Sequence, residues 1–142
     1  MNTSPSTPMR HGRWRLLAAL ACFLSPGLLL AQGSSSPAQI QQAYEAAAGT
    51  PAQAERGRAF FVQRHGGDWS CASCHGSLPT APGRHAVTGK ALEPLAPAFN
   101  PKALSDARRV EKWLRRNCTD VLRRECSPGE KADVLAWLRS LS

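Results

Sequence analysis

One pentapeptide near the middle of the chain, Cys71-Ala72-Ser73-Cys74-His75, limits its fold more than any other feature of the sequence. In the pattern Cys-x-x-Cys-His, the two thiols have the spacing that allows both to bond to one edge of a porphyrin. The histidine that follows is then held under the iron as an axial ligand. The pentapeptide therefore predicts one covalent haem c, bonded to Cys71 and Cys74, with His75 as the proximal iron ligand.

Two other chemistries also use closely spaced cysteines. A thioredoxin-like redox site needs a strand that leads into a helix, and residues 67–70 show no strand pattern. A structural zinc site needs a second close pair of ligands, and Cys118 and Cys126 are too far apart to resemble one. Haem attachment is therefore the interpretation that the motif favours.

The first 31 residues have the pattern of a secretory signal. Three arginines, Arg10, Arg13 and Arg15, precede an apolar run over residues 16–24, and a second short apolar run ends at Ala31. Both runs are too short for a comfortable membrane span. We therefore expect residues 1–31 to be a signal peptide, residues 32–142 to form a single c-type cytochrome domain, and the mature protein to lie in the periplasm. An uncleaved signal that anchors the protein is the alternative.

The remaining sequence predicts an all-α domain with one long loop. Residues 76–101 are rich in proline and glycine, and wrapping a cofactor would explain so long a loop in a small domain. Gly57 and Phe61 lie one helical turn apart, and this face is expected to cross the C-terminal helix at Trp137. Helix-start and capping signals predict helices over residues 38–48, over 51–64, from 105 onward and from 128 onward.

The sixth position on the iron is not filled by methionine. Met1 and Met9 are the only methionines and both lie in the predicted signal, which excludes a mature cytochrome with histidine and methionine ligands. The remaining candidates are His65, His85, a lysine, Asn117 or no protein ligand. His85 lies in the long loop, where such a ligand often occurs, and His65 is expected to cap the preceding helix.

Asn117 continues an apolar stripe formed by Val110, Trp113 and Leu114, so its amide is expected to face inward and to need a polar partner. Iron could be that partner. On spacing alone, a helix C-cap is the stronger interpretation, because asparagine is common there.

Cys118 and Cys126 are the only other cysteines after the predicted signal. In an oxidising compartment they are expected to form a disulfide that braces the segment directly after Asn117. Two unpaired buried thiols are the alternative.

Four stretches of the chain resemble the SHP-type oxygen-binding cytochromes c, a group of high-spin monohaem proteins. The resemblance implies a small cytochrome c fold, in which Asn117 ligates ferric haem and Cys118 is bridged to Cys126. It also implies a dihaem cytochrome c as the redox partner. The segment around His85 differs slightly in length from the family pattern. The matching stretches are AYEAAAGTPAQAERGRAFF (residues 43–61), CASCHG (71–76), TGKALEPLAPAFNPKALSDARRVEKWLRRNC (88–118), and REC (124–126) with PGEKADVLAWL (128–138), where Ser127 falls at a gap in the match.

With Asn117 as the ferric ligand, the expected function is gas binding. An amide oxygen is a hard, weak ligand that suits Fe(III) better than Fe(II). Reduction is therefore expected to release Asn117 and to open the iron to dioxygen, nitric oxide or carbon monoxide, with Trp113 and Leu114 lining that side. The alternatives are a simple low-spin electron carrier with His65 or His85 as sixth ligand, and an enzyme that oxidises nitric oxide.

The charge of the mature chain indicates the class of partner. Residues 32–142 carry 15 of the 18 lysines and arginines and all ten acidic residues, which gives a formal net charge of +5. Such a charge favours docking to an acidic redox protein. Nucleic acid is not expected as a partner, because the sequence lacks a basic stripe with interleaved aromatic residues.

Overall fold

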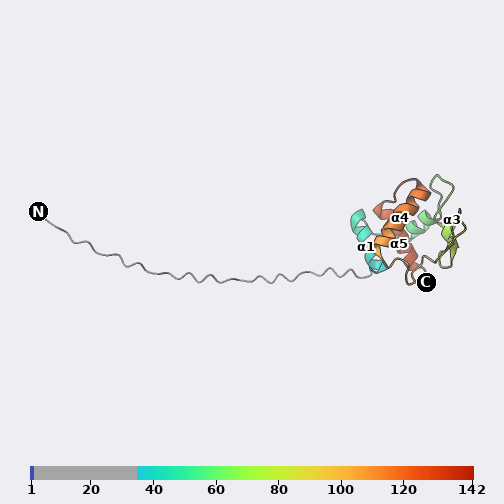
Figure 1. The fold of residues 1–142 in the computed structure, drawn as a ribbon, viewed down its shortest axis with the longest axis horizontal. Helices are drawn as coiled ribbons and strands as arrows, with labels where there is room; N and C mark the ends of the chain where they lie inside the picture. Colours follow the sequence, from blue (N-terminus) through green and yellow to red (C-terminus); the bar gives the residue numbers. More distant parts are fainter. Residues whose placement is uncertain (2–34) are drawn as a thin grey trace. The chain divides into compact units, whose positions relative to one another are not determined.

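A computed structural model of the chain describes Met1 and residues 35–142. Apart from Met1, the predicted signal peptide lies outside the described residues. The described part is mainly helical, as predicted, and none of its helices has the length and apolar character to span a membrane. The elements in chain order are α1 (Pro37–Ala48), α2 (Ala54–Val62), α3 (Ala72–His75), β1 (Gly83–Arg84), β2 (Ala91–Leu92), α4 (Ala107–Leu122) and α5 (Pro128–Ser140) (Figure 1).

Local sequence signals determine the ends of α1 and α5. The Ser36 hydroxyl accepts a hydrogen bond from the Gln39 N–H, and the Gln39 side chain accepts one from the Ser36 N–H. Ser127 and Glu130 form the same reciprocal pair at the start of α5. Gly49 ends α1 with a φ of 69°, a left-handed conformation that costs glycine little. The predicted end of α1 and the predicted start of α5 are therefore confirmed.

Helix α2 begins at Ala54, later than the predicted start at residue 51. The Ala52 N–H donates to the Glu45 carboxylate at 2.9 Å, and the Gln53 N–H donates to Asp133 Oδ1 at 2.6 Å. These partners come from α1 and α5, so they cannot be found in the local sequence. The helix begins at Ala54 because Gln53, its N-cap, has an extended backbone with φ −128° and ψ 117°.

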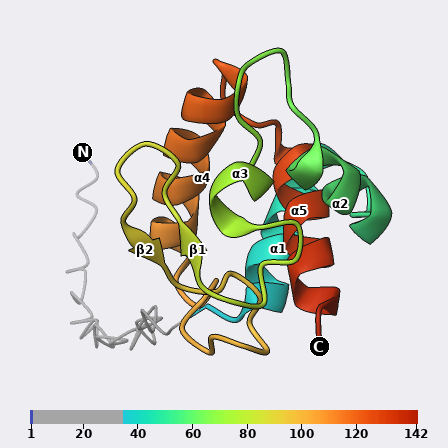
Figure 2. The ribbon, with the colours of Figure 1, turned by 90° about the vertical axis from the view of Figure 1, so that its right-hand side faces the viewer.

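Helices α2 and α5 cross as predicted, with α5 packed between α1 and α2 (Figure 2). Gly57 lies at the closest approach, where an added Cβ would be 1.9 Å from the carbonyl oxygen of Asp133. One turn later, the Phe61 ring packs on the Trp137 ring with centroids 4.8 Å apart. Phe61 and Trp137 form one buried cluster with Val134 and Leu138. The crossing therefore builds the main core directly beside α3.

A buried ion pair also joins these two helices. The Asp133 carboxylate accepts hydrogen bonds from Arg56 Nε at 2.7 Å and Arg56 Nη2 at 2.8 Å, in addition to the Gln53 N–H. Asp133 is buried, whereas the Arg56 side chain stays about half exposed. The carboxylate is thus fully engaged in bracing the start of α2.

Helix α4 differs from the sequence prediction at both ends. Asp106 caps its start by accepting a hydrogen bond from the Arg109 N–H at 2.9 Å, instead of the expected Ser105. The helix continues past Asn117 to Leu122, where Arg123 ends it with a φ of 61°. Asn117 is therefore inside the helix, and the interpretation of Asn117 as a C-cap is wrong.

The buried stripe of α4 also differs from the predicted one. Val110, Cys118 and Leu122 are buried, and Leu114 packs against the cluster that contains Val110. These positions repeat every four residues, whereas Trp113 precedes Leu114 and so lies about 100° further round the helix. Trp113 is 47% exposed and Asn117 is also exposed, so neither faces inward as expected. The two side chains share a flank of α4 that the described chain does not cover.

The predicted loop between α3 and α4 contains one small element that the sequence did not reveal. Strands β1 and β2 pair antiparallel, with Gly83 opposite Leu92 and Arg84 opposite Ala91. Strands of two residues are too short to produce an alternating apolar pattern, which explains why none was visible. The pair folds the loop back toward the pentapeptide.

Candidate haem-binding site

The pentapeptide forms a single helical turn, α3. The His75 N–H donates to the Cys71 carbonyl at 3.2 Å, and the turn ends at Gly76, which has a φ of 74°. On a helical turn, positions i, i+3 and i+4 share one face, so the side chains of Cys71, Cys74 and His75 project from the same side. Both thiols are free, and burial raises the pKa of the Cys71 thiol to about 11. The site therefore presents two thiols and an imidazole together.

The loop packs tightly against the second cysteine. A Cβ added to Gly83 would lie 2.3 Å from the Cys74 carbonyl oxygen, so only glycine fits there. The Ala86 N–H donates to Cys74 Sγ at 3.2 Å. Sequence reasoning did not single out Gly83 or Ala86, because their contacts depend on how the loop folds back. These contacts orient Cys74, and the residues present fit a covalently attached haem.

His75 has the environment of a neutral metal ligand. Its ring is half-buried and lies 6.3 Å from the Phe61 ring, centroid to centroid. Burial lowers the pKa of His75, and the nearby His85 lowers it further. Because a metal binds the unprotonated nitrogen of a neutral imidazole, this shift favours the form that binds iron.

His65 has a structural role. Its Nε2 lies 2.8 Å from the Phe60 carbonyl oxygen and donates a hydrogen bond to it, and its ring packs on the Phe60 ring at 4.4 Å. The carbonyl belongs to the last turn of α2, so the predicted capping role of His65 is confirmed.

His85 organises its own loop. Its Nδ1 accepts hydrogen bonds from the N–H groups of Val87 at 3.2 Å and Thr88 at 3.3 Å. His85 directly precedes Ala86, which contacts Cys74, and it is close enough to His75 to lower the pKa of His75. This placement puts His85 beside His75.

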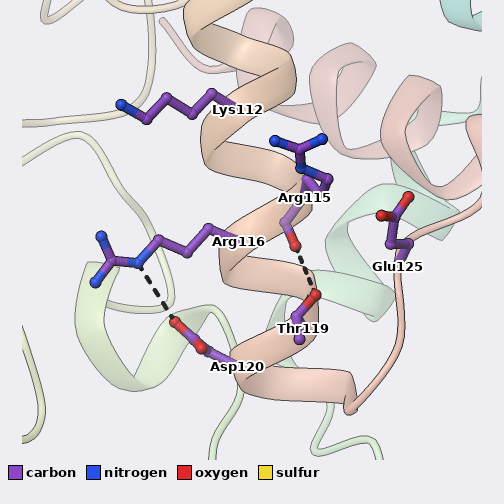
Figure 3. A pocket seen from close by; sticks show the side chains of 6 residues that line it. All are labelled: Lys112, Arg115, Arg116, Thr119, Asp120 and Glu125. Carbon is purple, nitrogen blue, oxygen red and sulfur yellow. Dashed lines mark hydrogen bonds and ion pairs between the residues drawn. The ribbon is translucent and has the colours of Figure 1, made fainter.

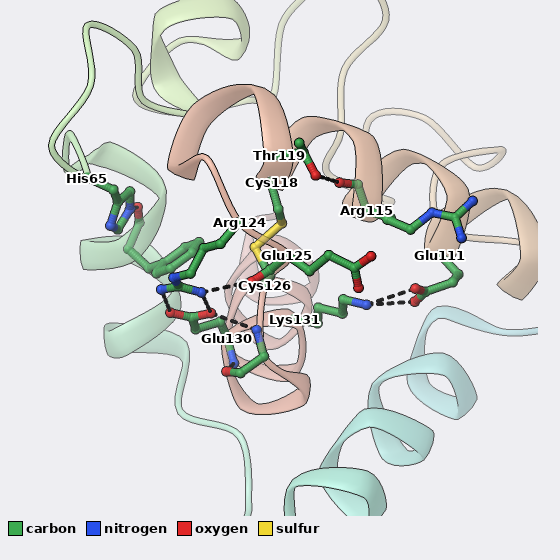
Figure 4. The surroundings of a disulfide bond; sticks show 12 residues. His65, Glu111, Arg115, Cys118, Thr119, Arg124, Glu125, Cys126, Glu130 and Lys131 are labelled. Carbon is green, nitrogen blue, oxygen red and sulfur yellow. Dashed lines mark hydrogen bonds and ion pairs between the residues drawn. A yellow bond between two sulfur atoms is a disulfide. The ribbon is translucent and has the colours of Figure 1, made fainter.

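Asn117 and the late cysteines lie together at the C-terminal part of α4. Cys118 and Cys126 are bonded as a disulfide with a Cα–Cα distance of 5.5 Å, and both are buried (Figure 4). The geometry of the chain thus accommodates the predicted bridge. The Asn117 side chain makes no hydrogen bond to any of the described residues, and it shares its flank of α4 with Trp113.

Removing the bridge is expected to destabilise the fold. Replacing Cys118 and Cys126 together with alanine should lower the free energy of unfolding by about 2–3 kcal/mol, because the unfolded chain regains the freedom of a short closed loop. Urea denaturation of the two proteins measures this difference. Unfolding curves that coincide, or two reactive thiols titrated in the unreduced unfolded parent protein, would contradict the bridge.

The outer face of α4 forms a basic surface. A shallow surface hollow of about 450 Å³ lies along this face (Figure 3). Arg116 and Asp120 form a weak exposed ion pair at 3.9 Å, which neutralises little of the charge. The hollow is lined by Lys112, Arg115, Arg116, Thr119, Asp120 and Glu125.

Comparisons with known protein families and sequences place these features in context. Residues 47–138 match the family model described as a domain of unknown function, DUF1924. The chain is 50% identical over 128 residues to the cytochrome c-type protein SHP of Cereibacter sphaeroides, which covers 87% of this chain and 96% of the relative. It is 41% identical over 86 residues to cytochrome c'' of Methylophilus methylotrophus, which covers 58% of this chain and 60% of the relative.

Solved structures give the same relationship. The chain matches a structure of oxidised SHP, an oxygen-binding cytochrome c, with a TM-score of 0.69 and 54% identity over 75% of this chain and 97% of that chain. It matches the crystal structure of oxidised cytochrome c'' from Methylophilus methylotrophus with a TM-score of 0.67 and 32% identity, covering 75% of this chain and 94% of that chain.

Proposed function

The chain belongs to the family of SHP-type cytochromes c, and on this basis we propose that it is a periplasmic cytochrome whose reduced form binds a diatomic gas. The predicted cytochrome c fold and the single covalent haem c are confirmed by this membership. Export rests on the signal pattern of residues 1–31. The mass of the exported protein, which would begin at Gln32, tests this part of the proposal.

The haem, when bound, supplies a redox-active iron that can hold a gas molecule. Cys71 and Cys74 fix its position, and the neutral imidazole of His75 is available to the iron from one side. Asn117 would hold the ferric iron through its amide oxygen, which would be a weak ligand for Fe(II). Dioxygen is the ligand that the family favours, and the same open position also accepts nitric oxide or carbon monoxide.

The observation that carries this proposal is the amide of Asn117. It lies inside α4 on an uncovered flank, and no described residue satisfies its hydrogen-bonding groups. Of the two competing histidines, His65 donates to a helix carbonyl, and His85 accepts hydrogen bonds at Nδ1 from its own loop beside His75. These placements support Asn117 as a weak, displaceable ligand, whereas a permanent electron carrier would need a strong one.

Optical spectra of the variant Asn117→Ala test the proposal. We expect this change to alter the ferric spectrum, whereas the matched variant His85→Ala leaves it unchanged. The reduced parent protein should show a five-coordinate spectrum that shifts when carbon monoxide is added. Sharp low-spin bands without a carbon monoxide shift, or a ferric spectrum that responds to His85→Ala alone, would establish the simple electron carrier instead.

The redox partner is proposed to be an acidic protein that docks on the outer face of α4. Three cations, among them Lys112 and Arg115, line the hollow together with two carboxylates, Asp120 and Glu125. Glu111 of α4 is bound to Lys131, and it also attracts Arg115. A surface with unbalanced positive charge attracts an acidic partner and speeds its association. The family resemblance implies that this partner is a dihaem cytochrome c.

Charge reversal on α4 tests the docking surface. Anaerobic oxidation of the ferrous protein by ferricyanide, an anion, should be slowed about tenfold at low salt by Lys112→Glu with Arg115→Glu. The control Arg58→Glu with Arg64→Glu makes the same change in net charge on exposed residues of α2 and its end. Equal slowing by both pairs would mean that net charge alone governs the rate and would exclude a specific surface.

A further inference from the structure

Helix α4 is attached to the rest of the domain mainly through side chains. Within residues 35–142, its backbone approaches no other element as closely as α5 approaches α1 and α2. Val110 packs against Ile40 and Leu135, and further along the helix Cys118 and Leu122 form a separate cluster with Cys126. Apolar contacts of this kind have little directional preference, so they leave α4 some freedom to slide and rotate.

A network of directional polar contacts restricts this freedom of α4. Lys131, on α5, donates from Nζ to both carboxylate oxygens of Glu111 on α4, each at 2.9 Å (Figure 4). The hydroxyl of Tyr44, on α1, donates to Glu111 Oε2 at 2.7 Å, and Lys131 Nζ lies 5.4 Å from the centroid of the Tyr44 ring. The Lys131 side chain is only 8% exposed. Three helices therefore meet at one carboxylate.

The network keeps a single protonation pattern near neutral pH. Hydrogen bonds from Lys131 and Tyr44 lower the pKa of Glu111, so its carboxylate stays ionised. Burial and the adjacent Glu111 raise the pKa of Tyr44, so its hydroxyl keeps its proton. Both shifts favour the ionised carboxylate and the protonated hydroxyl that this hydrogen bond needs.

This restraint lies near Asn117 along α4 and therefore affects where Asn117 is held. Glu111 precedes Asn117 by six residues, a rise of about 9 Å, and the disulfide begins at the next residue, Cys118. At the other end, Cys126 and Lys131 flank the start of α5. Helix α4 is therefore attached to the chain around the start of α5 by two contacts. Glu111 makes one before Asn117, and Cys118 makes the other after it. Two fixed points prevent the rotation and sliding that one point would allow.

We propose that Tyr44, Glu111 and Lys131 are positioning residues that set the rotation and height of α4, and thereby hold Asn117 where it can reach the ferric iron. This inference rests on the proposed function, in which Asn117 is the displaceable ligand. The Lys131 side chain is buried while that of Glu111 is 44% exposed, and the directional hydrogen bonds between them favour one arrangement of the helices, which an apolar contact of similar size does not require.

Azide binding to the ferric holoprotein tests the proposal, because an external anion must displace Asn117. Lys131→Met removes the ion pair with Glu111 and keeps most of the apolar volume of the side chain. We expect this variant to bind azide on the order of tenfold more tightly, because a larger fraction of the protein then has a free iron. Asp133→Asn is the matched control. This change weakens the ion pair between Asp133, on the same helix, and Arg56. Because that pair braces α2 and does not contact α4, azide affinity should not change.

A double-mutant cycle separates positioning from general loosening. If Lys131 acts through Asn117, then Lys131→Met should have no further effect on azide affinity in a protein that already carries Asn117→Ala. An equal tightening in both backgrounds, or tightening by Asp133→Asn as well, would overturn the proposal. Glu111→Gln and Tyr44→Phe are milder variants that should give smaller shifts of the same sign, and they replace Lys131→Met if that protein does not fold.

The cycle also distinguishes failure of this inference from failure of the proposed function. If Asn117→Ala itself leaves azide affinity and the ferric spectrum unchanged, Asn117 is not the displaceable ligand and both proposals fall. If Asn117→Ala tightens azide binding and Lys131→Met does not, the function stands and only the positioning role is excluded.

Discussion

Replacing Cys71 and Cys74 together with alanine is expected to abolish covalent haem attachment. The two thiols project from the same face of α3, and they are the free cysteines among the described residues. Without them no thioether can form, so haem should be lost from the polypeptide on a denaturing gel stained for haem. The fold should also be weakened, because Cys71 packs against the cluster of Phe61 and Trp137 and a domain of this size depends on a large apolar cofactor.

The late cysteines provide the control for this experiment. The pair Cys118→Ala and Cys126→Ala should keep the haem on the gel, although the protein is less stable. Haem that stays attached after both Cys71 and Cys74 are replaced would contradict the assignment of the attachment site. Loss of haem from the Cys118 and Cys126 variant as well would mean that folding, and not the thioether bonds, decides retention.

Among the described glycines, Gly57 is expected to be the position where an added methyl group lowers stability most. In an exposed helix this change stabilises by about 1 kcal/mol. At Gly57 the added Cβ would lie 1.9 Å from the backbone oxygen of Asp133, so α2 and α5 would have to separate. We expect the free energy of unfolding to fall by about 3 kcal/mol or more, because the overlap is with backbone and cannot be relieved by a side-chain rotation. Thermal or urea denaturation measures the loss.

Gly129→Ala, in the first turn of α5, makes the same chemical change in open surroundings. Its added Cβ would come no closer than 3.9 Å to a neighbouring atom. Stability should be unchanged or slightly increased. If Gly57→Ala behaves like Gly129→Ala, the helices do not cross at the distance described.

The parts of the fold that could be predicted from the sequence depend on short-range chemistry. The spacing of Cys71, Cys74 and His75 is a property of one helical turn, and capping at Ser36 and Ser127 is complete within four residues. The meeting of the Gly57 face with Trp137 was also predictable, because a small residue one turn from an aromatic residue leaves a groove for a neighbouring helix.

The errors arose where distant residues decide the local structure. The start of α2 lies later than predicted, at a place where the Gln53 N–H is held by a carboxylate 80 positions away. Similarly, the buried stripe of α4 is set by Val110 and Cys118, which pack against other helices, so Trp113 and Asn117 are turned to the flank. The network of Tyr44, Glu111 and Lys131 left no local sign, since each member comes from a different helix. Such contacts can be identified only once the helices are placed together.

The disulfide has a consequence for how the chain would mature after the proposed export. The four cysteines after residue 31 need different oxidation states in one compartment. Cys71 and Cys74 must remain thiols until haem is attached, while Cys118 and Cys126 are oxidised. Cys118 and Cys126 are separated by 8 positions, whereas any cross-pair would close a loop of at least 44. Closing the longer loop costs about 1.5 kcal/mol more in chain entropy. The distance along the chain therefore disfavours disulfides between the two pairs before the domain has folded, without help from the finished structure.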